Sequence, residues 1–217
     1  MPARTYKTIL FDLDGTLIDS IELILSSYRH TMTVHRGTVP PDEVWMEGLG
    51  TPLRVQFRRF TDDPAEIHAM VETYREFNMA NHDAMVSAFP GMEAAVRHLH
   101  ENGARLGIVT SKNRSGTERG LERVGFQGLF NVLVTADDVE RPKPDPEPVL
   151  RALELLGSGA DETIFVGDSP HDLAAGRRAG VSTAAVRWTP FPHHELEAHR
   201  PDWWIERPAQ LTELGQT

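Results

Sequence analysis

The sequence predicts an α/β fold, in which a Rossmann-like parallel sheet forms the core and carries an inserted α-helical cap subdomain. Short apolar runs such as 8–11 and 164–166 end in acidic residues or glycine, which is typical of buried parallel strands. Helical stripes such as the one within 92–99 separate these runs, and this alternation indicates βαβ units around a parallel sheet. One long stretch, about residues 20–88, shows helical stripes and no strand.

Five apolar runs are the expected core strands, at residues 8–11, 106–109, 132–134, 164–166 and 183–186. In an open parallel sheet, ligands bind outside the carboxyl ends of the strands. Polar residues that directly follow these runs are therefore candidates for chemistry. The tail from Pro190 onward is expected to pack a last helix and strand on the core, with Trp203 and Trp204 as packing residues.

The helical stretch is too long for a simple crossover between two strands. One stripe lies within residues 21–32 and another within 67–77, each with the spacing of one helix face. The stretch begins just after the first strand and ends near Pro90-Gly91, so both connections lie near one edge of the sheet. We therefore predict an α/β catalytic core of residues 1–19 and 89–217, with residues 20–88 as a helical cap.

The charge balance and the lack of cysteine exclude several classes of function. The 217 residues include 22 Lys and Arg against 32 Asp and Glu, a formal net charge of −10, which argues against a nucleic-acid partner. Without cysteine, disulfides, zinc–thiolate sites and thiol nucleophiles are excluded. No apolar run approaches the ~20 residues that cross a bilayer, and no signal-peptide core is present. We expect a cytoplasmic protein without a membrane partner, and nothing in the sequence indicates an oligomeric state.

Two acidic turns follow expected strands. The first is Asp12-Leu13-Asp14-Gly15-Thr16-Leu17, where Gly15 permits the turn that lets both carboxylates converge on one pocket. The second contains Asp168 at a strand end and Asp172 in the first turn of an expected helix. Oxygens from both turns suit a hard cation. The alternatives are a solvated turn for the first pair and complementation of the helix dipole for Asp172.

Two further groups are candidates for holding an anion. Thr110-Ser111 ends a strand and opens a helix, where hydroxyls and free N–H groups can bind phosphate; the alternative is an ordinary N-cap. Lys143 lies between Pro142 and Pro144, which stiffen its loop. A lysine held there can offset phosphate charge, although most loop lysines are simply solvated.

These elements, in this order, resemble the haloacid dehalogenase superfamily of phosphohydrolases over nearly the whole chain. The matching motifs are Asp12–Thr16, Thr110, Lys143, and Gly167-Asp168 with Asp172. The helical insertion is similar to the small α-helical cap of that superfamily. The resemblance implies an enzyme, a Mg²⁺-dependent hydrolase of small phosphate compounds.

The resemblance also implies a role for each matching residue. Asp12 is the implied nucleophile, which gives an aspartyl-phosphate, and Asp14 is the implied general acid and base. Asp12, the backbone carbonyl of Asp14, and Asp168 are the implied Mg²⁺ ligands, while Asp172 is implied to orient metal-bound water. The implied ligands of the phosphoryl oxygens are Thr110, with the adjacent Ser111, and Lys143.

Particular residues separate this chain from other members of the superfamily. Haloalkanoate dehalogenases lack the second aspartate of the first motif, so Asp14 argues against that activity. Phosphonate hydrolases use a cap lysine, and residues 20–88 contain none. Sugar phosphomutases commonly have Asp-Gly-Val where this chain has Asp14-Gly15-Thr16. Phosphoryl transfer to a sugar is therefore a weaker alternative, as is a non-catalytic phosphate-binding module.

Two hydrolase subgroups compete for the substrate. Phosphoglycolate phosphatases share all the motifs, and PpaX-like pyrophosphatases also share the stretches 73–78 and 143–150. We favour pyrophosphate, with phosphoglycolate or another small phosphomonoester as the alternative. The cap is expected to choose the substrate through the turn that contains Gly50, Thr51 and Arg54. Arg54 is a candidate ligand for a second anionic group, or else a solvated arginine at a helix start.

Overall fold

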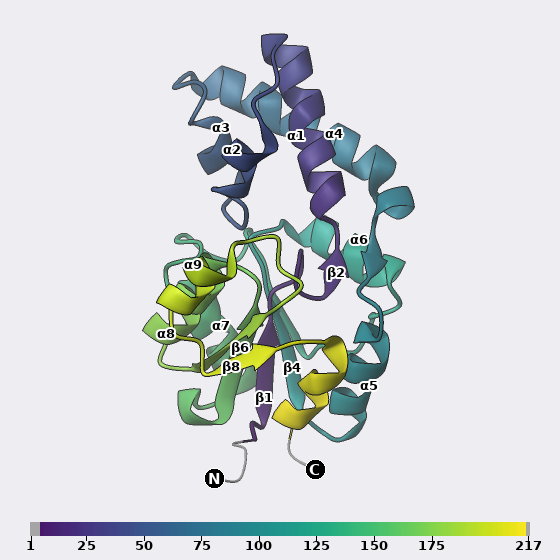
Figure 1. Ribbon diagram of the computed structural model, residues 1–217, viewed down its shortest axis with the longest axis vertical. Coiled ribbons are helices and arrows are strands. Elements are labelled where there is room, and N and C mark those ends of the chain that lie inside the picture. Colours follow the sequence, from purple (N-terminus) through teal and green to yellow (C-terminus); the bar gives the residue numbers. More distant parts are fainter. Residues whose placement is uncertain (1–4, 216–217) are drawn as a thin grey trace.

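A six-stranded sheet forms the middle of the lower part of the protein in the computed structural model, which describes residues 5–215 (Figure 1). The strand order is β5-β4-β1-β6-β7-β8, and every pairing in this sheet is parallel. The strands are Thr8–Phe11 (β1), Arg105–Val109 (β4), Val132–Val134 (β5), Thr163–Gly167 (β6), Ser182–Val186 (β7) and Trp203–Ile205 (β8). The predicted α/β class is confirmed.

The central strand β1 brings the two acidic motifs to one edge of the sheet. It pairs with β4 on one side and β6 on the other, so that Phe11 lies opposite both Ile108 and Val166. All four of its residues are buried. Because the three strands run parallel and end at the same level, the residues that follow them, including Asp12 and Asp168, emerge side by side.

Helices cover both faces of the sheet. The side chains of β1, which point alternately to the two faces, contact helices on each side. Ile9 and Phe11 belong to an apolar cluster with residues of α5 and of the short 3₁₀ helix η2. Leu10 points to the opposite face and packs in a second cluster with residues of α7 and α8. The core helices are Met92–Glu101 (α5), Arg114–Arg123 (α6), Glu147–Leu156 (α7), Pro170–Arg178 (α8), His193–Ala198 (α9), and the 3₁₀ helices Ala160–Glu162 (η1) and Pro208–Leu214 (η2).

Four helices lie together beyond the carboxyl end of β1 (Figure 1). They are Ile21–Arg36 (α1), Asp42–Met46 (α2), Leu53–Phe57 (α3) and Pro64–Met85 (α4). Aromatic side chains join them: Tyr28 of α1 stacks on Trp45 of α2 with ring centroids 4.3 Å apart, and it also contacts Phe57 and Tyr74. Most residues of one apolar cluster come from these four helices, called the cap helices below, and from the turn between α2 and α3. The others come from α8, β7, α9 and the loop at Phe191, so this cluster continues into the core. The boundaries at residues 20 and 88 stay a prediction.

The two linkers to these helices lie side by side and form a small antiparallel pair. Ile18–Asp19 (β2) pairs with Ser87–Ala88 (β3). The expectation that residues 20–88 contain no strand was wrong at Ser87–Ala88. A strand of two residues is too short to show an alternating hydrophobic pattern. These residues form a strand only because a segment distant in the chain lies beside them.

The tail supplies the expected last helix and strand, α9 and β8, together with η2. Trp203 packs against the apolar cluster of α5, and Trp204 packs against the cluster of the cap helices. The indole of Trp204 also lies 3.8 Å from the guanidinium carbon of Arg187. None of the described helices combines the length and the apolar character that crossing a membrane requires.

Candidate active site

Three carboxylates from two strand ends converge at the carboxyl edge of the sheet. Asp12 follows β1, Asp168 follows β6, and Asp172 lies in the first turn of α8. One oxygen of each carboxylate lies within 4.8 Å of the other two. All three residues are buried. The structure therefore brings together the two acidic turns that are far apart in the sequence.

Gly15 makes this close approach possible. Its φ of +83° lies in the left-handed region, which glycine adopts at little cost. A Cβ at this position would lie 2.4 Å from Asp168 Oδ2, so any other residue would collide with the carboxylate. The next residue, Thr16, donates its hydroxyl hydrogen to Asp168 Oδ1 at 3.3 Å.

Lys143 lies within the acidic cluster and is itself buried. Its Nζ donates to Asp12 Oδ1 (2.7 Å), to Asp172 Oδ1 (2.6 Å) and to the carbonyl oxygen of Val109 (3.2 Å). All three ammonium hydrogens therefore have acceptors within the protein. Burial alone would lower the pKa of Lys143, but Asp12 and Asp172 together raise that pKa above its usual value. Lys143 therefore keeps its positive charge at neutral pH.

With all three carboxylates ionised, the cluster would hold more negative charge than Lys143 can offset. Burial raises the pKa of Asp12 to about 7, against the lowering effect of Lys143. Burial, together with the charges of Asp172 and Asp12, also holds the pKa of Asp168 well above its usual value. Moreover, Asp168 Oδ2 is buried and has no hydrogen-bond partner among the described residues. An unpaired buried carboxylate oxygen among converging carboxylates fits a divalent cation with oxygen ligands, such as Mg²⁺.

Asp172 belongs both to the cap of helix α8 and to the acidic cluster. Its Oδ2 accepts hydrogen bonds from the backbone N–H (3.0 Å) and the hydroxyl (2.6 Å) of Ser169, which caps α8 in return. Its Oδ1 accepts the bond from Lys143. The helix cap thus fixes the carboxylate rigidly, and the lysine links it to Asp12.

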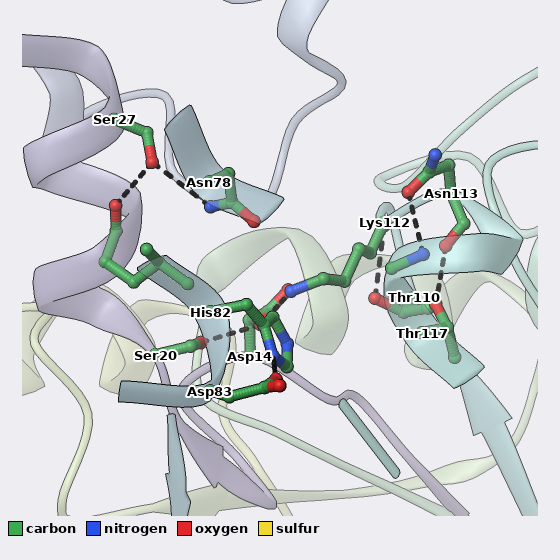
Figure 2. A network of polar contacts seen from close by, with 12 residues as sticks. Asp14, Ser20, Ser27, Asn78, His82, Asp83, Thr110, Lys112, Asn113 and Thr117 are labelled. Carbon is green, nitrogen blue, oxygen red and sulfur yellow. Dashed lines mark hydrogen bonds and ion pairs between the residues drawn. The ribbon is translucent and has the colours of Figure 1, made fainter. Parts of the chain in front are cut away.

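Asp14 has hydrogen-bond partners of its own, Ser20 and Lys112 (Figure 2). Its Oδ1 accepts a hydrogen bond from Ser20 Oγ at 2.6 Å. Lys112 Nζ donates to the same oxygen at 2.8 Å and to Oδ2 at 3.2 Å. The sequence interpretation missed Ser20 and Lys112. The only signal for Lys112 was its place directly after Thr110-Ser111.

The Thr110-Ser111 turn lies beside these residues at the end of β4. Ser111 Oγ is buried without a hydrogen-bond partner in residues 5–215, and Thr110 Oγ1 accepts a bond from the backbone N–H of Lys112 at 3.2 Å. The N-cap of α6 is Asn113, whose side chain accepts a bond from the N–H of Gly116. The alternative interpretation of Thr110-Ser111 as the N-cap is therefore wrong, and both residues line a cavity.

That cavity, of about 530 Å³, lies between the strand ends and the cap helices. The core contributes Asp12, Asp14, Asp168, Ser111 and Lys112 to its walls. The cap contributes mostly apolar and neutral polar groups, among them Ile24, Tyr28, Leu49, Val71, Tyr74 and Asn78. The cavity is thus charged on the core side and mainly uncharged on the cap side.

The turn between α2 and α3 reaches this cavity. Gly50, Thr51 and Arg54 all line it. Gly50 has a φ of +87°, and a Cβ there would lie 3.4 Å from Ser169 Oγ of the core, so this turn lies directly over the core. Arg54 is exposed and forms no ion pair with any of residues 5–215.

Comparison with known proteins agrees with this arrangement of motifs. The profile of the family described as haloacid dehalogenase-like hydrolase matches residues 9–186. The chain belongs to this family. The predictions of the family and of a hydrolase enzyme are therefore confirmed.

Two relatives illustrate where the chain stands within the haloacid dehalogenase-like hydrolases. The pyrophosphatase PpaX of Anoxybacillus flavithermus is 41% identical over 208 residues, which cover 96% of each chain. The pyrophosphatase PpaX of Halalkalibacterium halodurans is 41% identical over 209 residues, again 96% of each chain. The resemblance to PpaX-like proteins, noted in two stretches of the sequence, extends over nearly the whole chain.

Solved structures share the fold of this chain. A protein from Lactobacillus plantarum that is provisionally named a phosphoglycolate phosphatase aligns with a TM-score of 0.86 at 26% identity, over 97% of this chain and 99% of that one. A mutant of CbbY from Rhodobacter sphaeroides, crystallised in complex with xylulose-1,5-bisphosphate, aligns with a TM-score of 0.85 over 98% of this chain and 100% of its own. At 22% identity, this second likeness shows the fold alone.

Proposed function

We propose that this hydrolase cleaves a small phosphate compound through an aspartyl-phosphate on Asp12, with Mg²⁺ as its cofactor. The observation that carries the proposal is the buried cluster of Asp12, Asp168 and Asp172, in which Asp168 Oδ2 has no partner within the described part of the chain. A cluster of this kind is unfavourable by itself, because like charges are buried together. A divalent cation would remove that cost.

Asp12, the backbone carbonyl of Asp14, and Asp168 would hold the Mg²⁺ ion. Asp172, fixed by Ser169 and Lys143, would complete the surroundings of the ion. When bound, the ion supplies positive charge that lets a phosphate dianion approach carboxylates. We also propose residues 20–88 as the cap and the rest of the chain as the core.

The chain's own residues then divide the reaction into two displacements. In the first, an Asp12 oxygen bonds to phosphorus while the bond from phosphorus to the leaving oxygen breaks, and Asp14 gives that oxygen a proton. In the second, a water oxygen bonds to the same phosphorus while the bond to Asp12 breaks, and Asp14 takes the proton of the water. Phosphate is released, and both aspartates return to their starting states.

Three groups would bind the phosphoryl oxygens. Ser111 Oγ, beside Thr110, is a buried donor to which residues 5–215 offer no partner. Lys143 already has three acceptors, so a contact with the phosphoryl group requires it to exchange one of them. Its positive charge acts on the reacting oxygens in either arrangement.

Pyrophosphate is the favoured substrate. The proposal is supported by identity of about 41% to relatives named pyrophosphatase. In pyrophosphate the leaving group is itself an anion, and Arg54 at the cavity wall is an exposed cation that can receive it. Gly50 and Thr51 would shape the same part of the wall.

An organic phosphomonoester is the second candidate, and the cavity favours it. Its volume of about 530 Å³ lies within the range of about 300–1,000 Å³ typical of sites for organic ligands. The side chains of Ile24, Leu49 and Val71 form part of its cap side. Such a wall suits a substrate with a carbon body, of which phosphoglycolate would be a small example.

Phosphate release from a panel of substrates tests the proposal. We expect pyrophosphate to give the highest kcat/KM, turnover to cease with EDTA, and Mg²⁺ to restore it better than Ca²⁺, whose looser coordination fits the site less well. A higher kcat/KM for phosphoglycolate or aryl phosphates would select the second candidate. No phosphate release from any substrate would contradict a hydrolase mechanism, and transfer to a sugar without free phosphate would indicate a mutase.

A further inference from the structure

Asp14 is held by two donors to which the proposed reaction gives no role (Figure 2). Ser20, at the start of the first cap helix, donates to Asp14 Oδ1. Lys112, from the loop after β4, approaches from the other side and donates to both oxygens. The side chains of Lys112 and Asp14 are only 12% and 18% exposed. The pair is therefore shielded from most of the solvent, which strengthens it relative to a surface ion pair.

The structure fixes Lys112 from its backbone to its ammonium group. Its N–H donates to Thr110 Oγ1 at 3.2 Å, and its carbonyl oxygen accepts a bond from the N–H of Ala136 at 3.0 Å. The aliphatic part passes over Gly116, where an added Cβ would lie 3.0 Å from Lys112 Cε. Such a path leaves the long side chain little freedom, so the ammonium group is directed at Asp14.

The two oxygens of Asp14 are not equivalent in this arrangement. Oδ1 accepts two short hydrogen bonds, from Ser20 at 2.6 Å and from Lys112 at 2.8 Å. Oδ2 accepts the longer bond from Lys112, at 3.2 Å. Asp14 also lines the cavity. A proton to be given to a leaving group therefore belongs on Oδ2, because Oδ1 is already occupied by two donors.

We propose that Lys112 is a positioning residue for Asp14, which it holds so that Oδ2 is presented to the leaving oxygen. The inference rests on the proposed function, since it requires Asp14 to act as acid and base. Lys112 itself touches neither the reacting bond nor the phosphoryl group in this role. Lys112 acts by orienting the carboxylate of Asp14, and small errors in that orientation slow proton transfer.

The test is the dependence of kcat/KM on the leaving group in Lys112→Met. This constant reports the steps up to the release of the leaving group, and only leaving groups of high pKa need a proton from Asp14. For phenyl phosphate and alkyl phosphates we expect a loss of about 10–100-fold, within the range that acid–base catalysis contributes. For p-nitrophenyl phosphate, whose leaving group departs without a proton, we expect a change of less than about threefold.

Further variants make the result specific. Lys112→Arg keeps a cation near Asp14 and should recover part of the loss on phenyl phosphate. In a double-mutant cycle, Lys112→Met should add little to Asp14→Asn, because both remove the same function. Lys7→Met is the matched control: Lys7 forms an exposed ion pair with Glu162, and this variant should show wild-type kinetics with every substrate.

Three results would overturn the inference. An equal loss for all leaving groups, together with a lower Tm, would mean that Lys112 has a structural role only. A KM increase restricted to pyrophosphate and phosphoglycolate, with aryl phosphates unaffected, would make Lys112 a ligand for a second anion. Full additivity of the effects of Lys112→Met and Asp14→Asn would show that the two residues act independently. Absence of turnover in the wild-type chain would instead contradict the proposed function itself.

Discussion

Asp12 and Asp14 belong to one turn, but their electrostatic surroundings are opposite. Asp12 enters a buried cluster with Asp168 and Asp172, where one oxygen finds no partner among residues 5–215. Asp14, two residues later, leaves that cluster and pairs with Lys112 and Ser20 near the cap. The first region has too much negative charge for its surroundings, whereas the second is already balanced.

The contrast indicates a division of labour between the two regions. An unbalanced cluster gains from binding a cation, so the region of Asp12 is suited to holding Mg²⁺ and phosphate. Asp14 is already paired with a cation and gains less from a second one, which fits its proposed role in proton transfer rather than a role as a metal ligand through its carboxylate. Variants of each region should therefore fail in different ways.

The largest effect is expected for Asp12→Asn. An amide at this position cannot attack phosphorus, so kcat should fall by about a thousandfold or more, as is usual when a covalent nucleophile is lost. Phosphate release measures the loss, and circular dichroism checks that the fold is intact. Asp62→Asn, an exposed position in the loop before α4, is the matched control. Activity within tenfold of wild type in Asp12→Asn would contradict the nucleophile assignment.

Asp168→Asn should separate stability from activity. The substitution removes a buried carboxylate whose Oδ2 has no partner in the described structure, so the Tm of the metal-free protein should rise by about 2–8 °C. The same change should abolish both turnover and the additional rise in Tm that Mg²⁺ gives the wild type by binding the native state. Differential scanning fluorimetry with EDTA or Mg²⁺ measures both shifts. An undiminished Mg²⁺ response in the variant would contradict the role of Asp168.

The metal-free protein should also lose stability as pH rises from the unfolded-state pKa of Asp12 toward its folded-state pKa. The pKa of this group rises from 3.8 to about 7 in the fold, so between these values the folded state binds more protons than the unfolded state. Burial lowers the pKa values of His82 and His171, which gives the opposite trend. The quantity to measure is therefore the Tm difference between Asp12→Asn and wild type in EDTA, from pH 5 to pH 8.

That difference should favour Asp12→Asn increasingly as pH rises, because only the wild type must bury the charge at position 12. A difference that stays constant between pH 5 and pH 8 would show that Asp12 has an ordinary pKa in the fold. Saturating Mg²⁺ should reverse the trend in the wild type, since the ion stabilises the charged carboxylate.

The smallest effect is expected from the cap. Arg54→Ala should raise KM for pyrophosphate by about 3–10-fold and leave kcat nearly unchanged, because the exposed guanidinium contributes binding rather than chemistry. Phenyl phosphate, which has no second anionic group, should show no change. Arg58→Ala is the control, since Arg58 is exposed and does not line the cavity. Equal KM values for wild type and Arg54→Ala on pyrophosphate would exclude the anion role.

The sequence predicted the acidic cluster better than the surroundings of Asp14, for a physical reason. Apolar runs mark buried strands, and parallel strands bring their carboxyl ends together, so the meeting of Asp12 with Asp168 follows from local patterns. The pairing of Lys112 with Asp14 joins residues that are 98 positions apart and depends on the exact path of a flexible side chain. No local pattern specifies such a path.

The same physical reason applies to the unpredicted strand β3 and to an exposed leucine of α7. The strand Ser87–Ala88 exists only because the linker at Ile18–Asp19 lies beside it. Leu150 belongs to a helical apolar stripe and is nevertheless 47% exposed, because the stripe is wider than the surface it covers. Periodicity predicts which residues share a face, but tertiary contacts decide how much of that face is buried.

The most direct test of the account is the mass of the Asp14→Asn variant after reaction with p-nitrophenyl phosphate and Mg²⁺. This substrate needs no acid to form the phosphoenzyme, while the missing base slows hydrolysis of the intermediate, so it should accumulate. Intact-mass spectrometry after an acid quench should show the addition of one phosphoryl group, and peptide mapping should locate it on Asp12. A burst of p-nitrophenol without any phosphorylated protein, or a phosphoryl group on another residue, would contradict the account.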